Sequence, residues 1–248
     1  MSVAALLSAV ALLSQAPAGE VLFDGASKAA WKDESAAADR VREIPSPTTA
    51  PSPQLRFLAR KTDVAPLTPT NRPRAQLVSA TNVMREGGVY WQSVKLRIPT
   101  NFPRLRRNET ALLVTPAYGP PYKGSPPLGL RVLGNDLVIK TNKYGRPRLQ
   151  EIWDMRIRRG RWIRFTFRFQ LARDGWTEMY VDGRRATFTV DGRRTRRPRL
   201  ALLDRTNGKG PWSARLSVYF DGDIQRDHLS TAFAGFRIAT TRAAAEGG

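Results

Sequence analysis

The sequence contains no cysteine and a single histidine, His228, among its 248 residues. Without cysteine, the chain can form neither disulfide bonds nor thiolate metal sites. One histidine also leaves no histidine cluster for a transition metal, and the carboxylates are not grouped in a ligand-like spacing. We therefore expect neither a metal site nor a cofactor.

Long hydrophobic runs are also missing. The longest apolar stretch, Val3 to Leu13, is well short of the roughly 20 residues that span a bilayer. Ala16-Pro17-Ala18 follows it as a small-x-small cleavage pattern. We predict a secretory signal peptide over residues 1–18, a secreted and extracellular protein, and no membrane insertion. No Lys or Arg precedes the apolar run, so an upstream start or a buried helix are the alternatives.

Acidic residues are few, with 21 Asp and Glu against 41 Lys and Arg, which gives a net charge of +20. Arginine accounts for 33 of the basic residues, and it can hold a carboxylate, sulfate or phosphate through two parallel hydrogen bonds. Residues 146–199 alone contain sixteen Arg and six acidic residues. Such a surface suits a polyanion, although a genome rich in Arg codons and a solvated face explain it equally well. Because no nucleic-acid-binding motif accompanies the charge, we do not expect nucleic acid as the partner.

Short alternating segments dominate the rest of the chain. Val89 to Ile98 is the clearest predicted strand, and Arg161 to Phe169 places Ile163 and three Phe on one face. Gly134-Asn135-Asp136 and Asp182-Gly183 are typical of hairpin turns. We find no predicted helix longer than about two turns beyond the signal. Roughly a dozen strands at this spacing predict an all-β sandwich or barrel. The other predicted strands lie within 21–25, 54–59, 76–78, 112–115, 128–132, 137–140, 178–183, 200–203, 214–220 and 233–240.

These strands fit one domain over residues 19–242. Residues 34–53 are rich in Ala, Pro, Ser and Thr, which predicts a long surface loop within that domain. The piece before this loop is too small to fold alone, so the loop is not a domain boundary. We expect residues 243–248 to be a disordered tail and the protein to be a monomer.

Several motifs, in order, resemble those of known sugar-binding proteins. The run Trp162 to Gly183 is similar to a hairpin of lectin-like jelly rolls. Arg74-Ala75-Gln76-Leu77 resembles the R-x-E-L strand of the heparin-lyase-like polysaccharide lyases, with Gln76 where Glu is usual. Further matches to that family are Tyr90 to Pro103, Tyr118 to Leu128, and Gly235 to Arg242, where Ala239 replaces a Gly. The resemblance covers residues 72–242 and implies a concanavalin A-like jelly roll of two curved antiparallel sheets.

The resemblance implies β-elimination at a uronic acid of an acidic polysaccharide. That reaction needs a group to neutralise the uronate carboxylate, a base and an acid. Arg74 and Gln76 lie two apart on a predicted strand, so their side chains share a face and could bind the carboxylate together. An ordinary solvated pair is the alternative. We add Tyr122, Lys123 and Arg131 as candidate substrate-binding residues.

Tyr219, Tyr118 and His228 are the candidate catalytic residues. Tyr219 occupies the position of a Tyr on a late strand of the family, although simple core packing would also explain it. His228 lies in a predicted loop beside Asp227, where histidines more often face solvent than act as catalysts. Family lyases commonly carry a catalytic His on the strand that here reads Thr115-Pro116-Ala117. A Tyr would then have to act as both base and acid.

Three functions therefore stay open. The first is a secreted polysaccharide lyase, and the second is a non-catalytic carbohydrate-binding jelly roll, which the missing strand His favours. The third is a basic envelope protein that associates with polyanions or nucleic acid, which only the charge favours. The lyase hypothesis predicts that Arg74, Gln76, Tyr118 and Tyr219 converge in one groove on a concave sheet.

Overall fold

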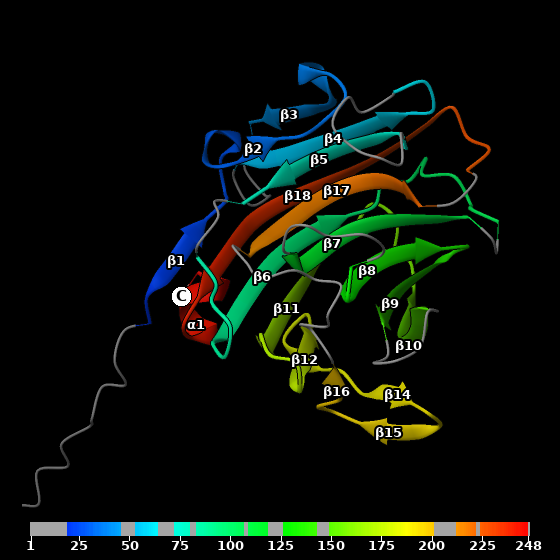
Figure 1. Cartoon of the computed structure of the whole chain (residues 1–248). Coiled ribbons are helices and arrows are strands. Elements are labelled where there is room, and N and C mark those ends of the chain that lie inside the picture. Colours follow the sequence, from blue (N-terminus) through cyan, green and yellow to red (C-terminus); the bar gives the residue numbers. More distant parts are fainter. Residues whose placement is uncertain are drawn as a thin grey trace, which may run out of the picture.

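The computed structural model describes residues 19–45, 53–63, 72–79, 83–106, 109–118, 126–142, 149–200, 212–221 and 224–247. Two large antiparallel sheets pack face to face and a separate two-stranded hairpin lies at one end (Figure 1). This is one of the two all-β architectures that the strand pattern predicted, and it is the jelly-roll sandwich that the family resemblance implied. The predicted signal peptide, residues 1–18, lies outside the described residues.

The first sheet has nine strands, ordered β13-β12-β11-β6-β18-β4-β3, with β1 paired to β18 and β16 paired to β12. Its longest strand, β18, pairs with three others, β1, β4 and β6. The bounds are β1 Val21–Asp24, β3 Val41–Ile44, β4 Gln54–Arg60, β6 Val89–Arg97, β11 Trp162–Gln170, β12 Gly175–Val181, β13 Arg184–Arg185, β16 Arg199–Leu200 and β18 His228–Ala239.

The second sheet has seven strands, ordered β10-β9-β8-β7-β17-β5-β2. Its strands are β2 Lys32–Asp33, β5 Arg74–Val78, β7 Thr110–Tyr118, β8 Leu128–Leu133, β9 Asp136–Asn142, β10 Leu149–Arg156 and β17 Ser213–Asp221. The hairpin pairs β14 Phe188–Val190 with β15 Arg193–Thr195. The helices are short: 3-10 helices η1 Lys28–Ala30 and η2 Ala38–Arg40, and α1 Arg242–Glu246.

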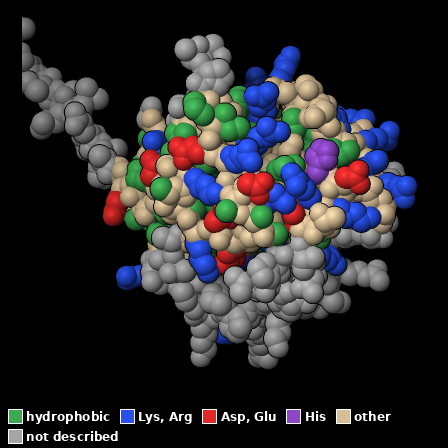
Figure 2. Space-filling view, turned by 90° about the horizontal axis from the view of Figure 1, so that it is seen from above, with side chains coloured by type: hydrophobic (Ala, Val, Ile, Leu, Met, Phe, Trp, Pro, Cys, Tyr) green, Lys and Arg blue, Asp and Glu red, His purple; other side chains and the backbone are tan. Residues whose placement is uncertain are grey.

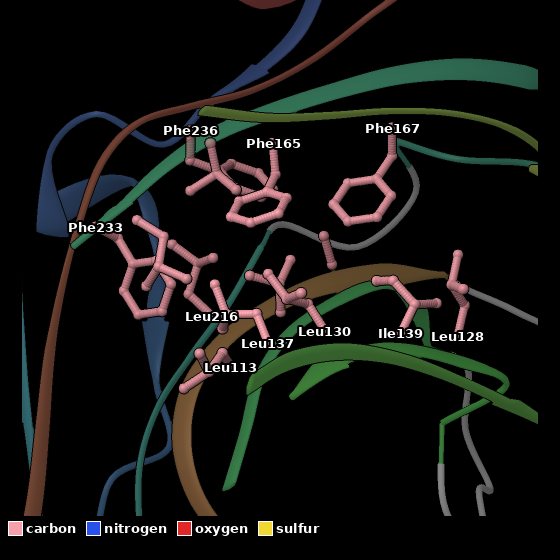
Figure 3. Packing of buried hydrophobic residues seen from close by; sticks show 14 of the residues in the cluster. Leu113, Leu128, Leu130, Leu137, Ile139, Phe165, Phe167, Leu216, Phe233 and Phe236 are labelled. Atoms are coloured by element: carbon pink, nitrogen blue, oxygen red, sulfur yellow. The ribbon is translucent and has the colours of Figure 1, made fainter. Parts of the chain in front are cut away.

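The core lies between the two sheets and follows from the alternation in the sequence. On β11, Ile163, Phe165, Phe167 and Phe169 are all buried. Figure 3 shows Phe165 and Phe167 facing a layer of aliphatic side chains from the other sheet. Successive side chains of a strand point to opposite faces, so a sheet with one buried face alternates apolar and polar residues.

The two sheets curve in the same sense, and the strands of the seven-stranded sheet bend with their convex side toward the core (Figures 1 and 3). The outer face of the seven-stranded sheet is therefore concave, and that of the nine-stranded sheet is convex. A concave sheet face brings side chains from neighbouring strands toward a common centre.

The turn predicted at Asp182-Gly183 forms, and a second Asp-Gly turn, which was not predicted, forms at Asp191-Gly192. Asp182 and Gly183 have φ of 47° and 81°, and Asp191 and Gly192 have φ of 48° and 75°. Two successive residues with positive φ are the mark of a tight hairpin turn matched to the strand twist, and Asp-Gly is a preferred sequence for it. These turns join β12 to β13 and β14 to β15.

Two segments are more ordered than the sequence predicted. Within the predicted loop 34–53, η2 and β3 form, because β3 completes the edge of the nine-stranded sheet by pairing with β4. The expected disordered tail instead contains α1. Its Ala245 is buried, and the Glu246 carboxylate accepts a hydrogen bond from Thr166 Oγ1 at 2.7 Å. Among the described residues, no helix is both long and apolar enough to span a membrane.

Candidate active site

β17 carries polar side chains on the concave face of its sheet. Ala214, Leu216 and Val218 point into the core, so the residues between them point the other way. Those residues are Arg215, Ser217 and Tyr219. The concave face therefore presents charged and hydroxyl groups at the centre of the sheet.

Register places two of the predicted site residues directly opposite each other. Arg74 on β5 pairs with Tyr219 on β17. Tyr219 pairs in turn with Leu112 on β7, and Leu112 pairs with Arg131 on β8. A single row across four strands thus carries Arg74, Tyr219 and Arg131 on one face. The Arg74 guanidinium lies over the Tyr219 ring, 4.8 Å from Cζ to the ring centroid.

A bulge in β7 brings Tyr118 to the same face. Proline cannot donate a ladder hydrogen bond, so Pro116 in this central strand is compatible only with a local irregularity. The pairing with β17 shifts there, because Thr115 faces Arg215 whereas Tyr118 faces Ser213. Ala117 consequently points into the core. If β7 alternated strictly from Thr115 onward, Tyr118 would point into the core instead.

Tyr118 packs against a second arginine. The Arg215 guanidinium lies over the Tyr118 ring, 3.5 Å from Cζ to the centroid. Glu34 joins the group, with its carboxylate 3.9 Å from Arg215 Nη1 and accepting a hydrogen bond from Gln76 Nε2 at 3.1 Å. The concave face therefore holds two arginine–tyrosine stacks, and Glu34 joins Arg215 of one stack to Gln76.

The cluster is largely shielded from solvent. Arg74, Gln76 and Arg131 are only 4%, 3% and 1% exposed. Burial lowers the pKa of Arg74, with Tyr219 acting against it, and burial also lowers the pKa of Arg215. Burial raises the pKa of the Tyr118 hydroxyl, and the Arg215 charge opposes part of that rise. Charges in such a site interact more strongly than they would in water.

Arg131 needs the glycine beside it. Gly129 lies two residues before Arg131 on β8, so both residues are on the same face of the sheet. A Cβ at Gly129 would lie 2.8 Å from Leu112 Cδ1 and 3.6 Å from Arg131 Nε. A Cβ at this position would require the end of the Leu112 side chain to move, and it would lie in van der Waals contact with Arg131. Gly129 thus leaves room for the large buried side chain of Arg131.

Thr115 lies in the part of β7 that corresponds to the histidine-bearing strand of the lyase family that the sequence resembles. It is fully buried, and its Oγ1 has no hydrogen-bond partner in the described structure. It pairs with Arg215 at the centre of the concave face. A hydroxyl at this point can donate or accept a hydrogen bond, but it is a far weaker base than an imidazole at neutral pH.

The other predicted residues differ in where they lie. His228 is the first residue of β18 in the other sheet, exposed and paired with Arg60, so the structure does not bring it to the cluster. The sequence predicted a loop here, but β18 begins earlier because it pairs along all of β4. Tyr122 and Lys123 lie outside the described residues.

Two residues of the cluster were not predicted, Arg215 and Glu34. The alternation of β17 contained the signal for Arg215, since it lies on the same side as Tyr219. No local signal identified Glu34, which lies just after the two-residue strand β2. In the described part of the chain, no three His, Asp or Glu side chains gather as a metal site would require.

Comparison with known proteins agrees with this fold. The chain is similar in fold to an endo-β-1,4-glucuronan lyase from the fungus Trichoderma reesei, with a TM-score of 0.58 and 13% identity, covering 82% of this chain and 87% of that one. Alginate lyase A1-II′ of polysaccharide lyase family 7 gives a TM-score of 0.56 and 10% identity, covering 82% and 83%. The family 7 alginate lyase AlgAT5 gives 0.54 and 11%, covering 84% and 93%.

A search of curated proteins found no significant match. Residues 23–199, however, match the polysaccharide lyase family directly. That match includes β5, β7 and β8 and therefore Arg74, Tyr118 and Arg131, while the β17 residues lie beyond it. This chain belongs to the polysaccharide lyase family.

Proposed function

We propose that the chain is a secreted polysaccharide lyase that cleaves a uronate-containing polysaccharide by β-elimination on the concave face. The observation that supports this most is the convergence of Arg74, Gln76 and Arg215 with two tyrosines in a shielded cluster. Cations, an amide donor and phenol groups are the groups that the reaction requires.

The reaction begins with removal of the proton on the carbon next to the uronate carboxylate. The electron pair left by that proton forms a carbon–carbon double bond, and the bond to the glycosidic oxygen on the neighbouring carbon breaks. The leaving oxygen then takes a proton. The products are one chain with a new reducing end and one with an unsaturated uronate at its non-reducing end, and no water is consumed.

Arg74 and Gln76 are the groups that we assign to the uronate carboxylate. Negative charge builds on this carboxylate as the proton leaves, and a guanidinium and an amide donor stabilise that charge most where water is excluded. The Glu34 carboxylate accepts a hydrogen bond from the Gln76 side-chain amide, and this bond holds the amide in one orientation. Arg131 and Arg215 are then placed to hold neighbouring uronates.

The two tyrosines are the proton-transfer groups of this proposal. We assign Tyr219 as the base, because its ring lies against Arg74, the group assigned to the uronate carboxylate, next to the carbon that loses its proton. We assign Tyr118 as the acid, because burial raises the pKa of its hydroxyl and keeps the proton in place. Two tyrosines in different surroundings can thus act one as the acid and the other as the base.

The similar structures suggest which polymers to test first. They are named for glucuronan and alginate, both polymers of uronic acids. The sequence motifs resemble those of heparin-lyase-like enzymes, so heparin belongs in the same panel. The Arg-rich chain suits any of these polyanions.

The test mixes the purified chain with heparin, alginate, glucuronan and hyaluronan and follows the ultraviolet absorbance of the unsaturated uronate. We expect the absorbance to rise with at least one polymer. A hydrolase would shorten the polymer without this absorbance, and that outcome would overturn the proposal. Export is tested separately by mass spectrometry of the released protein, which should begin at Gly19.

A non-catalytic carbohydrate-binding protein is the second candidate. The observation that favours it is Thr115, which leaves the centre of β7 without an imidazole base. Binding of a polyuronate with no new absorbance, at any pH and with every polymer of the panel, would establish this alternative in place of the lyase.

A further inference from the structure

An arginine-rich arm projects beside the end of the concave sheet. It comprises residues 184–199 and includes β13 and the β14–β15 hairpin, which stands apart from both sheets in Figure 1. The segment contains seven Arg and one acidic residue, and all seven arginines are exposed. By contrast, basic and acidic side chains are intermixed on the face that Figure 2 shows.

The arm is held firmly although its arginines are exposed. Phe188 is fully buried in the core, and Leu200 just beyond the arm is buried too. The Ala186 N–H donates to Met179 O at 2.8 Å, and the Thr177 N–H donates to Pro198 O at 3.2 Å. A surface held in place in this way loses little conformational entropy when it binds a ligand.

Some of the arginines already have partners. Arg185 Nη2 lies 2.7 Å from Glu178 Oε1, and Arg197 reaches the same carboxylate and stacks on Trp176. Arg199 pairs weakly with the exposed Asp174 at 3.7 Å. The remaining four have no carboxylate within ion-pair distance among the described residues: Arg184, Arg193, Arg194 and Arg196.

The arm lies at one end of the catalytic row. β14 contacts β10, the edge strand of the seven-stranded sheet. Tyr219 on β17 is four strands away from β10, about 19 Å at the usual spacing between strands. A polysaccharide that crosses the sheet along the row of Tyr219 and Arg131 would therefore reach the arm several sugars away from the point of cleavage.

We infer that this arm is a second binding site for the same anionic polysaccharide, engaging carboxylates or sulfates of sugars distant from the reacting one. The inference rests on the proposed function for the position of the reacting sugar. Exposed guanidinium groups with no internal partner bind such anions bidentately. Binding at the arm should weaken steeply with salt, because the contacts are exposed charges.

The test replaces Arg193, Arg194 and Arg196 with Gln together in the full chain. The matched control replaces Arg42, Arg56 and Arg60, which are exposed on β3 and β4 at the far end of the nine-stranded sheet. Both variants lose three positive charges. Affinities for a long polyglucuronate and for its disaccharide are measured by calorimetry at two salt concentrations, and duplex DNA serves as a second polyanion.

We expect the arm variant to bind the long polymer about fivefold more weakly, because three exposed guanidinium contacts are lost together. Its affinity for the disaccharide should be unchanged, and the control should bind the polymer like wild type. An equal loss in the control, or an equal loss for duplex DNA, would overturn the inference. A specific loss of polymer affinity in a protein that makes no unsaturated product would support the arm and overturn only the lyase proposal.

Discussion

The guanidinium of Arg74 lies over the ring of Tyr219, and the two residues are direct partners across β5 and β17. Both side chains leave the sheet on its concave face, where Arg74 is only 4% exposed. A cation is thus fixed beside a phenol in a site that excludes most water. In the proposed mechanism, this pair would provide both carboxylate neutralisation and proton transfer, two requirements of β-elimination.

Replacing Arg74 with Gln should lower kcat/KM by about 100-fold or more, because the site loses the charge that stabilises the transition state. Arg74→Lys keeps the charge but not the planar two-donor geometry, so it should recover only part of the rate. Steady-state rates of unsaturated-uronate formation give both values. Wild-type rates in Arg74→Gln would remove this residue from the mechanism.

Arg215 should affect binding and catalysis separately. Arg215→Gln should raise KM by about tenfold, because a substrate carboxylate loses a partner, and should lower kcat, because Tyr118 loses the group stacked on its ring. Arg215→Lys should restore KM but not kcat, since an ammonium keeps the charge without the planar stack. Equal effects of both variants on the two constants would contradict this division.

The pH profile should show the proton donor. Burial raises the pKa of Tyr118, so its hydroxyl stays protonated at pH values where free tyrosine, with a pKa of about 10, begins to ionise. We expect the alkaline fall in kcat to begin only above about pH 10. Tyr118→Phe should remove most of the activity and this alkaline fall, whereas Tyr180→Phe on the convex sheet should change neither. A wild-type profile in Tyr118→Phe would rule out the assignment.

Stability should depend on one buried ion pair that is not part of the active-site cluster. Arg40 Nε and Nη2 donate to the Asp63 carboxylate at 2.6 and 2.7 Å, and the Asp63 side chain is 6% exposed. Asp63→Asn leaves Arg40 without its carboxylate, so we expect a loss of about 3 kcal/mol in the free energy of unfolding. Asp39→Asn, which removes a more exposed partner of the same arginine, should cost less than about 1 kcal/mol.

The Arg40–Asp63 pair also predicts how the free energy of unfolding changes as pH falls. Burial alone would raise the pKa of Asp63, but hydrogen bonds from Arg40 and from the Arg60 N–H outweigh burial and lower it. A lowered pKa means that the pair stabilises the fold fully above the ordinary Asp value of about 3.9 and less as pH falls below it. Chemical denaturation from pH 7 to pH 3 should therefore show a smaller stability loss in Asp63→Asn than in wild type.

The fold was predictable from the sequence because most strands alternate cleanly. β6 and β11 bury one face each, and Asp-Gly turns mark two of the hairpins. β3 and β10 were not predicted. β3 has a single buried residue, Val41, so only its pairing with β4 makes it a strand.

The active-site cluster was predictable only in part. Arg74, Gln76 and Tyr219 follow from strand spacing and from the family motif. Tyr118 reaches the same face only through the bulge at Pro116, and a period of two would have pointed it into the core. Glu34 could not be found, because its contact with Gln76 spans 42 positions and depends on how the sheet closes at β2.

The most direct measurement compares wild type with Tyr219→Phe on the polyuronate that wild type cleaves fastest, using the ultraviolet absorbance of the unsaturated product. Calorimetry on the same samples gives the affinity, and Tyr180→Phe controls for the loss of a hydroxyl elsewhere. We predict that the rate in Tyr219→Phe falls by at least 100-fold while the affinity stays within about threefold of wild type. A Tyr219→Phe variant that forms product as fast as wild type would contradict β-elimination by this cluster.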